Sequence, residues 1–292
     1  RTLQSAIKSS LCSWATTFHH AVNSLRKTLN TQKLMLKLKQ INVLKPLLLF
    51  WIAAFFLGLN SFRGFRSEDQ KELPLACPLP LPEEQIISHT AYLLSYNEEH
   101  EQANWVAYML TSSKLGSGVE RSNRFLEDPL VASGTATNAD YAKSGYDRGH
   151  LAPAADMSWS MQVMQESFYY SNMSPQLPGF NRGIWKKLEE KVRDWAVQYD
   201  TLYVVTGPIL TAGLPTIGLN QISVPKQYYK ALIAPNQQKG IAFLLPNAKS
   251  EQLLSQYVLS IDALEQLLHR DLFYQVKDEL EKKMEAQLNF WP

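Results

Sequence analysis

The chain has 292 residues, enough for one large domain or two small ones, and its 45% hydrophobic and 19% charged residues are typical of a folded soluble protein. Its formal net charge of +2 hides an asymmetry, because residues 1–66 hold ten Lys and Arg and no Asp or Glu. The remaining 19 basic and 27 acidic residues give residues 67–292 a net charge of −8. This excludes a basic field over the whole domain, so any indication of a nucleic-acid substrate must come from a local site.

An apolar, uncharged stretch of 13 residues at 47–59 stands out in the N-terminal part of the chain. It is shorter than the roughly 20 residues of a membrane span, and with three lysines just before it, it is typical of a secretory signal. We predict that translation starts at Met35, that residues 1–34 are an upstream extension, and that 35–66 are a signal peptide or a membrane anchor. The protein is then exported, to the periplasm or the extracellular space, or anchored. A buried apolar helix is the structural alternative.

Residues 67–85 are rich in proline and carboxylates, which predicts an extended linker. The folded domain is predicted to span residues 86–292. The two cysteines, Cys12 and Cys77, both precede it. This domain therefore contains neither a disulfide framework nor a thiolate metal site.

The pattern of apolar residues predicts strands and helices along this domain. Short aliphatic and aromatic runs predict strands at 92–96, 103–110, 201–206, 229–233 and 241–245. Residues 111–146, rich in Ser, Gly, Asn and Asp, should be mostly loop. Helical periodicity appears at 159–166, at 184–195 and across 258–288. The irregular alternation predicts an α+β fold with a mixed, largely antiparallel central sheet flanked by helices.

The segment 136–195 carries the residue types that phosphoryl chemistry needs. The imidazole of His150 can take a proton from water at neutral pH, and the guanidinium of Arg148 matches the oxygens of a phosphate. Gly149 between them would let a phosphate approach the backbone, and Asn181 offers a neutral oxygen that Mg²⁺ accepts. Each has an ordinary alternative, because a lone histidine is more often structural and Asn181 stands where a helix N-cap is expected.

Four motifs follow one another in this segment: Ala-Thr-Asn-Ala-Asp-Tyr at 136–141, Asp-Arg-Gly-His at 147–150, Ser-Asn-Met-Ser-Pro-Gln at 171–176 and Asn-Arg-Gly-Ile-Trp-Lys-Lys-Leu-Glu at 181–189. With these motifs the sequence resembles the DNA/RNA non-specific endonuclease family. The resemblance extends loosely to residues 204–208, 224–230 and 260–265. A four-residue motif alone arises by chance, but this ordered set is specific.

The resemblance implies a ββα-metal site, in which a hairpin and a helix present a histidine and a metal ligand to one phosphate. By position, His150 would be the general base, and Asn181 would be the only direct protein ligand of one hydrated Mg²⁺ or Mn²⁺. Glu189 would hold a metal-bound water. Arg148 would bind the scissile phosphate, and Asn172 would orient His150 or the metal waters.

Two features of the implied site have alternatives. Glu189 could instead be a solvated helix position paired with Lys186 or Arg193. A site with two metal ions would need bridging carboxylates, and only Asp147 and Asp156 lie near the motif in sequence. We therefore expect one metal ion.

Basic residues around the motifs are expected to bind the substrate backbone. The family has a further arginine upstream, before an aromatic residue and an acidic-Pro pair. Both Arg121 and Arg124 fit this description, and Arg124 is favoured slightly. Arg182 and Lys186 are expected to join Arg148 in a local cationic groove. Contacts of this sort position a strand without reading its bases, so sequence tolerance is expected.

The sequence thus predicts a metal-dependent endonuclease that hydrolyses phosphodiester bonds of DNA and RNA without sequence specificity, with Mg²⁺ or Mn²⁺ as cofactor. The alternatives are a phosphodiesterase that acts on small phosphate esters and a non-catalytic nucleic-acid-binding module on the same scaffold. Membrane attachment through 47–59 and homodimer formation are compatible with the sequence, which identifies no protein inhibitor.

Overall fold

The computed structural model describes residues 77–82, 84–116 and 118–292. All of these lie in one compact unit of the chain, Lys71–Pro292. Within the described residues, no helix combines the length and the apolar character that a membrane crossing requires.

The N-terminal predictions fall largely outside this part. The predicted extension and the predicted signal or anchor, residues 1–66 with the apolar stretch 47–59, lie outside the described residues. The end of the predicted linker packs on the domain: Cys77 is buried, and Glu84 forms an ion pair of 2.7 Å with Arg270. The first strand begins at Gln85, one residue before the predicted start of the domain.

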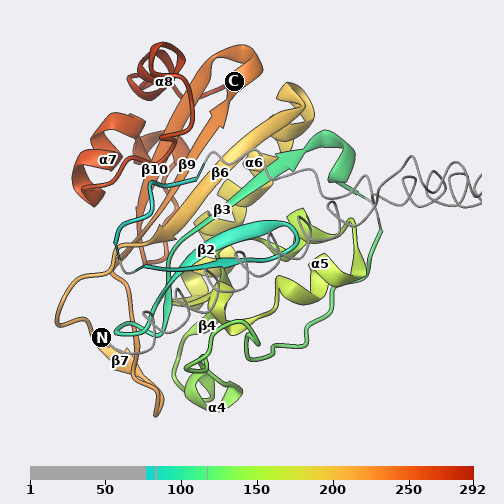
Figure 1. Cartoon of the computed structure of the whole chain (residues 1–292), viewed down its shortest axis with the longest axis vertical. Coiled ribbons are helices and arrows are strands. Elements are labelled where there is room, and N and C mark those ends of the chain that lie inside the picture. Colours follow the sequence, from blue (N-terminus) through green and yellow to red (C-terminus); the bar gives the residue numbers. More distant parts are fainter. Residues whose placement is uncertain (1–76, 83, 117) are drawn as a thin grey trace, which may run out of the picture. The chain divides into compact units, whose positions relative to one another are not determined.

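The centre of the fold is a seven-stranded sheet (Figure 1). In spatial order its strands are β1 (Gln85–Ser88), β2 (Tyr92–Asn97), β3 (Gln102–Thr111), β6 (Thr201–Pro208), β9 (Gln227–Ala234), β10 (Lys239–Pro246) and β11 (Val258–Leu259). Every neighbouring pair is antiparallel. The five predicted strands are β2, β3, β6, β9 and β10, so the largely antiparallel sheet is confirmed.

Both faces of the sheet are covered, because its central strands are apolar on both sides. In β6, Leu202 and Val204 belong to the core that contains α6 (Lys186–Tyr199). Val205 belongs to the opposite core, together with residues of α7 (Ile261–Leu268) and α8 (Asp278–Glu285). This alternation is the two-residue period of a strand. The domain therefore has three layers, and Figure 1 shows α7 and α8 beside β9 and β10.

Two of the three predicted helical segments contain one helix each, and the third contains two separate helices. α5 (Met161–Glu166) and α6 lie where helices were expected. The helical periodicity across 258–288 corresponds to two helices: α7 ends at His269, whose left-handed backbone (φ 51°) stops it. α8 begins only at Asp278.

Shorter elements complete the domain. In the segment expected to be mostly loop, the structure has only η2 (Ser112–Lys114), α4 (Asn138–Tyr141) and an isolated bridge before the first motif strand. The others are η3 (Ala154–Met157), η4 (Tyr170–Asn172), the pair β7 (Thr216–Ile217) and β8 (Ile222–Ser223), η6 (Pro235–Gln237) and η7 (Leu254–Tyr257).

Candidate active site

A separate two-stranded antiparallel sheet carries the Asp-Arg-Gly-His motif. Its strands are β4 (Asp147–His150) and β5 (Met173–Gln176), and after them the π-helical turn η5 (Phe180–Trp185) leads into α6. Side chains alternate along a strand, so Arg148 and His150 leave one face of β4 and Asp147 leaves the other. The backbone of Gly183 inside this turn is not helical (φ −106°, ψ −111°), so the turn is kinked.

His150 is buried, with 9% of the residue exposed. Its ring packs edge-on against Phe168, with ring centres 4.8 Å apart, and its centre lies 5.9 Å from that of Phe125. Burial, and then the positive charge of Arg121, lower the pKa of His150 from 6.5 to about 3. Its Nε2 atom has no hydrogen-bond partner among the described residues. His150 is therefore a neutral imidazole, the form that accepts a proton.

Arg148 is held beside this ring. Its Nε donates to the hydroxyl of Tyr170 at 3.0 Å, and its guanidinium carbon lies 5.0 Å from the ring centre of Phe125 and 5.6 Å from that of Tyr141. Because Phe125 contacts both side chains, Arg148 and His150 share one surface. The aromatic rings fix the guanidinium and leave donor groups for a phosphate.

Asn181 lies in the turn η5, which follows β5. Its hydrogen-bond partner is Asp147, at the start of β4. Its Nδ2 donates to Oδ2 of Asp147 at 2.9 Å. This bond fixes the orientation of the amide and leaves the oxygen Oδ1 to act as a ligand. Asn181 is not the N-cap of α6, because that position is Trp185.

Asp147 holds the amide of Asn181 and is itself held by Arg182. The guanidinium of Arg182 donates to both carboxylate oxygens, at 2.8 and 2.5 Å. Burial opposes the ionisation of Asp147, but the hydrogen bonds from Arg182 and Asn181 outweigh it and lower its pKa. Asp147 is therefore an ionised carboxylate whose function is to orient Asn181. From the sequence, Asp147 was a candidate only for a bridging metal ligand.

Glu189 is partly buried on α6. In the alternative interpretation, Glu189 is a solvated helix position paired with Lys186 or Arg193. Both cations are paired with other residues: Lys186 with Glu190 at 3.6 Å, and Arg193 with Asp156 at 2.9 Å. Burial raises the pKa of Glu189, and the nearby positive charges oppose that rise. Glu189 therefore faces a buried charged network rather than bulk water.

That network is a feature which the sequence did not reveal. Lys230 on β9 is fully buried, and its Nζ lies 4.8 Å from the ring centre of Trp185 with no hydrogen-bond partner among the described residues. Burial lowers the pKa of Lys230, and the charges of Glu189 and Asp156 oppose that shift. Asp156 accepts hydrogen bonds from Tyr108 (2.9 Å) and from an arginine of α6. The network sets the charge of Glu189.

The two candidate upstream arginines lie in different surroundings. Arg121 is close enough to His150 and Glu189 to influence the pKa of both, and its guanidinium carbon lies 5.0 Å from the ring centre of Phe168. Arg124, which the sequence favoured slightly, lines a cavity beside Met161 on α5. Arg121 is therefore the arginine that the fold brings to the candidate base.

Asn172 is fully buried and bonds only to the backbone. Its Oδ1 accepts from the amide of Ala152 at 2.9 Å, and its Nδ2 donates to the carbonyls of Ala152 (2.9 Å) and Ser167 (2.8 Å). It thereby ties the segment after His150 to the end of α5, next to Phe168. Asn172 is a positioning residue, and these bonds leave it no group to hold metal waters.

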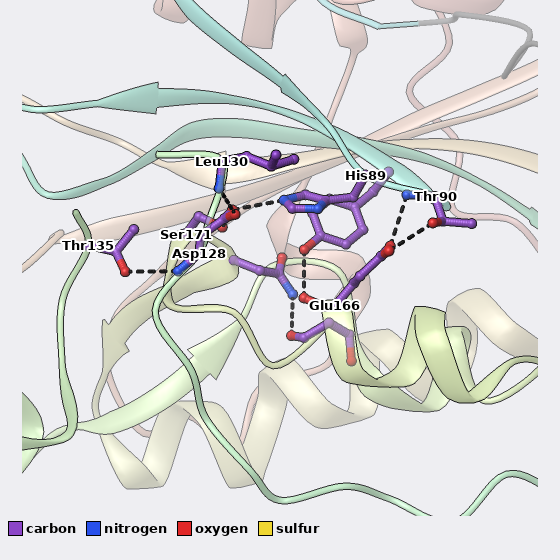
Figure 2. A network of polar contacts seen from close by, with 10 residues as sticks. His89, Thr90, Asp128, Leu130, Thr135, Glu166 and Ser171 are labelled. Carbon is purple, nitrogen blue, oxygen red and sulfur yellow. Dashed lines mark hydrogen bonds and ion pairs between the residues drawn. The ribbon is translucent and has the colours of Figure 1, made fainter. Parts of the chain in front are cut away.

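A buried polar network fixes the same segment to the large sheet (Figure 2). Asp128 accepts hydrogen bonds from His89 (2.8 Å) and from Ser171 (2.5 Å). Glu166 accepts from the backbone and the hydroxyl of Thr90, at 2.9 and 2.8 Å. These contacts anchor residues 166–171, and therefore the ring on which His150 packs.

Gly149 has a different role from the one expected. A Cβ atom at this position would lie 2.2 Å from Cδ and Oε1 of Gln176, the neighbouring side chain on β5. The absence of a side chain therefore makes room for Gln176 and not for a phosphate.

The donors near the hairpin fit one hydrated divalent cation. Within the described residues, the only three His, Cys, Asp or Glu side chains with ligand atoms close together are in α7 and α8, away from the hairpin. Asp147 and Asp156 are engaged in separate hydrogen bonds, so bridging carboxylates for two ions are missing from the part of the chain described. The oriented amide of Asn181 remains, a hard oxygen donor suited to Mg²⁺ or Mn²⁺.

Two antiparallel strands that run on into a helix, with the candidate base on the strands and the candidate metal ligand before the helix, define the ββα-metal class of nucleases. The chain belongs to the DNA/RNA non-specific endonuclease family, whose model matches residues 76–282. It is therefore an endonuclease that hydrolyses phosphodiester bonds of nucleic acids. Arg182 and Lys186, with side chains 72% and 63% exposed, are two basic residues of the turn and helix after β5 that reach solvent.

Curated relatives and a solved structure agree with this assignment. The chain is 36% identical to human mitochondrial endonuclease G over 198 residues, 62% of this chain and 67% of that protein. It is 32% identical to a nuclease of Nostoc sp. over 222 residues, which are 71% and 80% of the two chains. The crystal structure of endonuclease G in complex with its inhibitor EndoGI superposes with a TM-score of 0.63 at 30% identity, covering 68% of this chain and 89% of that one.

Proposed function

We propose that this endonuclease cuts DNA and RNA with His150 as general base and with one Mg²⁺ or Mn²⁺ held by Asn181. The observation that carries the proposal is the buried, neutral imidazole of His150 on the same surface as Arg148. A neutral imidazole takes a proton from water, and a guanidinium beside it binds the phosphate that the water attacks.

The chain's own residues account for most of the reaction. His150 accepts the proton as the water attacks phosphorus, and Arg148 and Arg121 bind the non-bridging oxygens as negative charge grows on them. The same two arginines hold the phosphate in line with the water. Glu189, kept near the site by its buried neighbours, would hold waters bound to the ion rather than the ion itself.

The ion would be held by Oδ1 of Asn181, whose orientation the bond to Asp147 fixes. When bound, it supplies Lewis-acid stabilisation of the phosphate and of the departing 3′ oxygen. No residue of this site needs the 2′-hydroxyl of RNA. Both DNA and RNA can therefore serve as substrates, with a 5′-phosphate left on the product.

Tolerance of sequence follows from the kind of side chain at the site. Arg121, Arg148 and the exposed Lys186 are cations that bind phosphate oxygens, and such contacts carry no information about the bases. Export or membrane anchoring and homodimer formation remain predictions from the sequence.

The experiment that tests the function is a nicking assay on supercoiled plasmid and on RNA, with Mg²⁺, Mn²⁺ or chelator. We expect both nucleic acids to be cut only in the presence of an ion, with no preferred sequence at the ends. A small chromogenic diester provides the comparison. Faster turnover of the diester would favour a small-ester phosphodiesterase, and binding without cutting would favour a non-catalytic module.

A further inference from the structure

A second cluster of carboxylates lies on the face of the sheet opposite α6, between α7 and α8. It lines a cavity of about 390 Å³. Asp262 and Glu265 come from α7, and Glu285 comes from the last position of α8. One oxygen from each of the three lies within 4.8 Å of the others.

Glu285 is the side chain that singles out this cluster. Only 6% of the residue is exposed, and its Oε1 has no hydrogen-bond partner among the described residues. A buried carboxylate oxygen without a donor is costly, because ionisation in a low-dielectric interior needs a compensating charge. No hydrogen-bond donor of the described residues reaches this oxygen.

Further carboxylates nearby add to the excess of negative charge around Glu285. Asp271 and Glu281 also line the cavity, and Oε1 of Glu281 is buried without a partner among the described residues. Arg270, at the rim, is already engaged with both carboxylate oxygens of Glu84, at 2.7 and 2.9 Å. The cavity thus gathers five carboxylates and no uncommitted arginine.

We propose that this cavity is a Ca²⁺ site that joins α7 to α8, separate from the catalytic ion. Ca²⁺ takes six to eight oxygen ligands, many of them from carboxylates, at about 2.3 to 2.6 Å. The oxygens of Asp262, Glu265 and Glu285 lie within 4.8 Å of one another, close enough for one ion to contact all three. Mg²⁺ retains several of its waters and is usually held by one or two carboxylates, so it suits a cluster of protein carboxylates less well.

One carboxylate of the site is already oriented by the fold. An oxygen of Glu265 accepts the backbone amide of Leu272 at 2.7 Å, which leaves its other oxygen for the ion. Glu285 lies beyond residue 282, where the family match ends. The site is therefore completed by a residue outside the part of the chain that matches the family model.

Ca²⁺ at this position would clamp the C-terminal helix onto the sheet. Met284, next to Glu285, is buried in the core of that face, and its carbonyl lies so close to Gly240 of β10 that a Cβ there would be 2.3 Å away. Bound Ca²⁺ removes the repulsion between the carboxylates and holds α8 in this contact. We expect it to stabilise the native state without changing the chemistry at His150.

The test measures thermal unfolding of the full chain after removal of metals, with CaCl₂ or MgCl₂ added. Ca²⁺ at 100 times its Kd should raise the Tm by about 5 to 10 °C, and Mg²⁺ should raise it much less. Asn181→Ala, which removes the proposed catalytic ligand, should keep the Ca²⁺ response.

Glu285→Gln should abolish the Ca²⁺ response, and so should Asp262→Asn, which serves if the first variant fails to fold. The matched control is Glu279→Gln, the same change at an exposed position of α8 outside the cavity. A full Ca²⁺ response in both Glu285→Gln and Asp262→Asn would overturn the proposal. So would a wild-type protein whose Tm is indifferent to Ca²⁺, or one that responds equally to Mg²⁺.

Discussion

His150 combines burial with an unpaired ring nitrogen, two properties that surface histidines lack. Leaving a buried polar atom without a partner costs about 1 to 3 kcal/mol. The rings of Phe168 and Phe125 hold the imidazole in this position, and neither can hydrogen-bond to it. A proton acceptor kept neutral and unpaired is suited to take a proton from water.

The depressed pKa of His150 has a consequence for the pH dependence of activity. Because burial holds this pKa at about 3, the base form dominates down to about pH 4. We predict that kcat/KM shows no acid limb near pH 6.5 in the free enzyme. A pH–rate profile at saturating Mg²⁺ checks this, and a limb at pH 6 to 7 that disappears in His150→Gln would contradict it.

The same shift predicts how stability depends on pH. The folded pKa of His150 lies below its ordinary value of 6.5, so its contribution is complete above pH 6.5 and is lost as the pH falls towards 3. Urea unfolding of wild type and His150→Gln between these limits should show a smaller pH slope in the variant. Equal slopes would mean that the ring is not buried in solution.

The upstream arginine provides a second residue-level test. Arg121→Ala should lower kcat/KM by about 10² to 10³, because a cation that stabilises the phosphate in the transition state is lost. Arg124→Ala is the matched control and should stay within a few-fold of wild type, since Arg124 lines a different cavity. A larger loss of kcat/KM in Arg124→Ala than in Arg121→Ala would assign the phosphate contact to Arg124 instead.

Sequence reasoning predicted roles for His150, Arg148 and Asn181 because the order and spacing of their motifs are distinctive. It could not choose between Arg121 and Arg124, because they are three positions apart in a loop whose path only the fold decides. No pattern in the sequence indicated that Lys230 belongs to the site. Its closeness to Trp185 and Glu189 arises from the packing of β9 against α6, which no local pattern encodes.

At the scale of elements, the hairpin and the following turn bring the site together. β4 and β5 are four residues each and lack alternating hydrophobicity, so sequence patterns alone did not predict them as strands. The longer strands of the main sheet were predicted to within a few residues because their apolar runs are bounded by turn residues. The break at His269 was missed because the apolar spacing continues on both sides of it.

Close packing inside the hairpin predicts the effect of Gly149→Ala. The added Cβ would lie 2.2 Å from Gln176, so we expect destabilisation of about 1 to 3 kcal/mol by overpacking. Gln176→Ala in the same chain should recover part of this loss, and urea unfolding of the four species measures the coupling. If Gly149→Ala were as stable as wild type but inactive, close approach of a phosphate would be the better explanation.

At the scale of the whole molecule, charge limits how the protein binds nucleic acid. Residues 67–292 carry a net charge of −8, so attraction to a polyanion depends on a few cations beside the hairpin. The candidates are Arg121, Arg148 and Lys186, because the guanidinium of Arg182 is committed to Asp147. With three phosphate contacts, we expect the binding constant for nucleic acid to depend only modestly on salt concentration.

For duplex DNA, we expect log K to fall against log salt concentration with a slope of about −2.7, which corresponds to three contacts. Lys186→Ala should reduce the magnitude of the slope by about 0.9. Lys282→Ala, on α8, removes the same charge far along the chain and should leave it unchanged. Fluorescence anisotropy with chelator present measures both, and equal slopes for Lys186→Ala and wild type would remove Lys186 from the interface.

The central claim is that one neutral imidazole activates the water that cuts both DNA and RNA. The most direct measurement is the single-turnover cleavage rate of His150→Ala on each nucleic acid, with the exposed His269→Asn as control and Mn²⁺ affinity determined alongside. The account predicts that His150→Ala loses about 10² to 10⁴ in rate on both substrates, keeps its Mn²⁺ affinity and is partly rescued by added imidazole. Cleavage by His150→Ala at the wild-type rate on either substrate would contradict it.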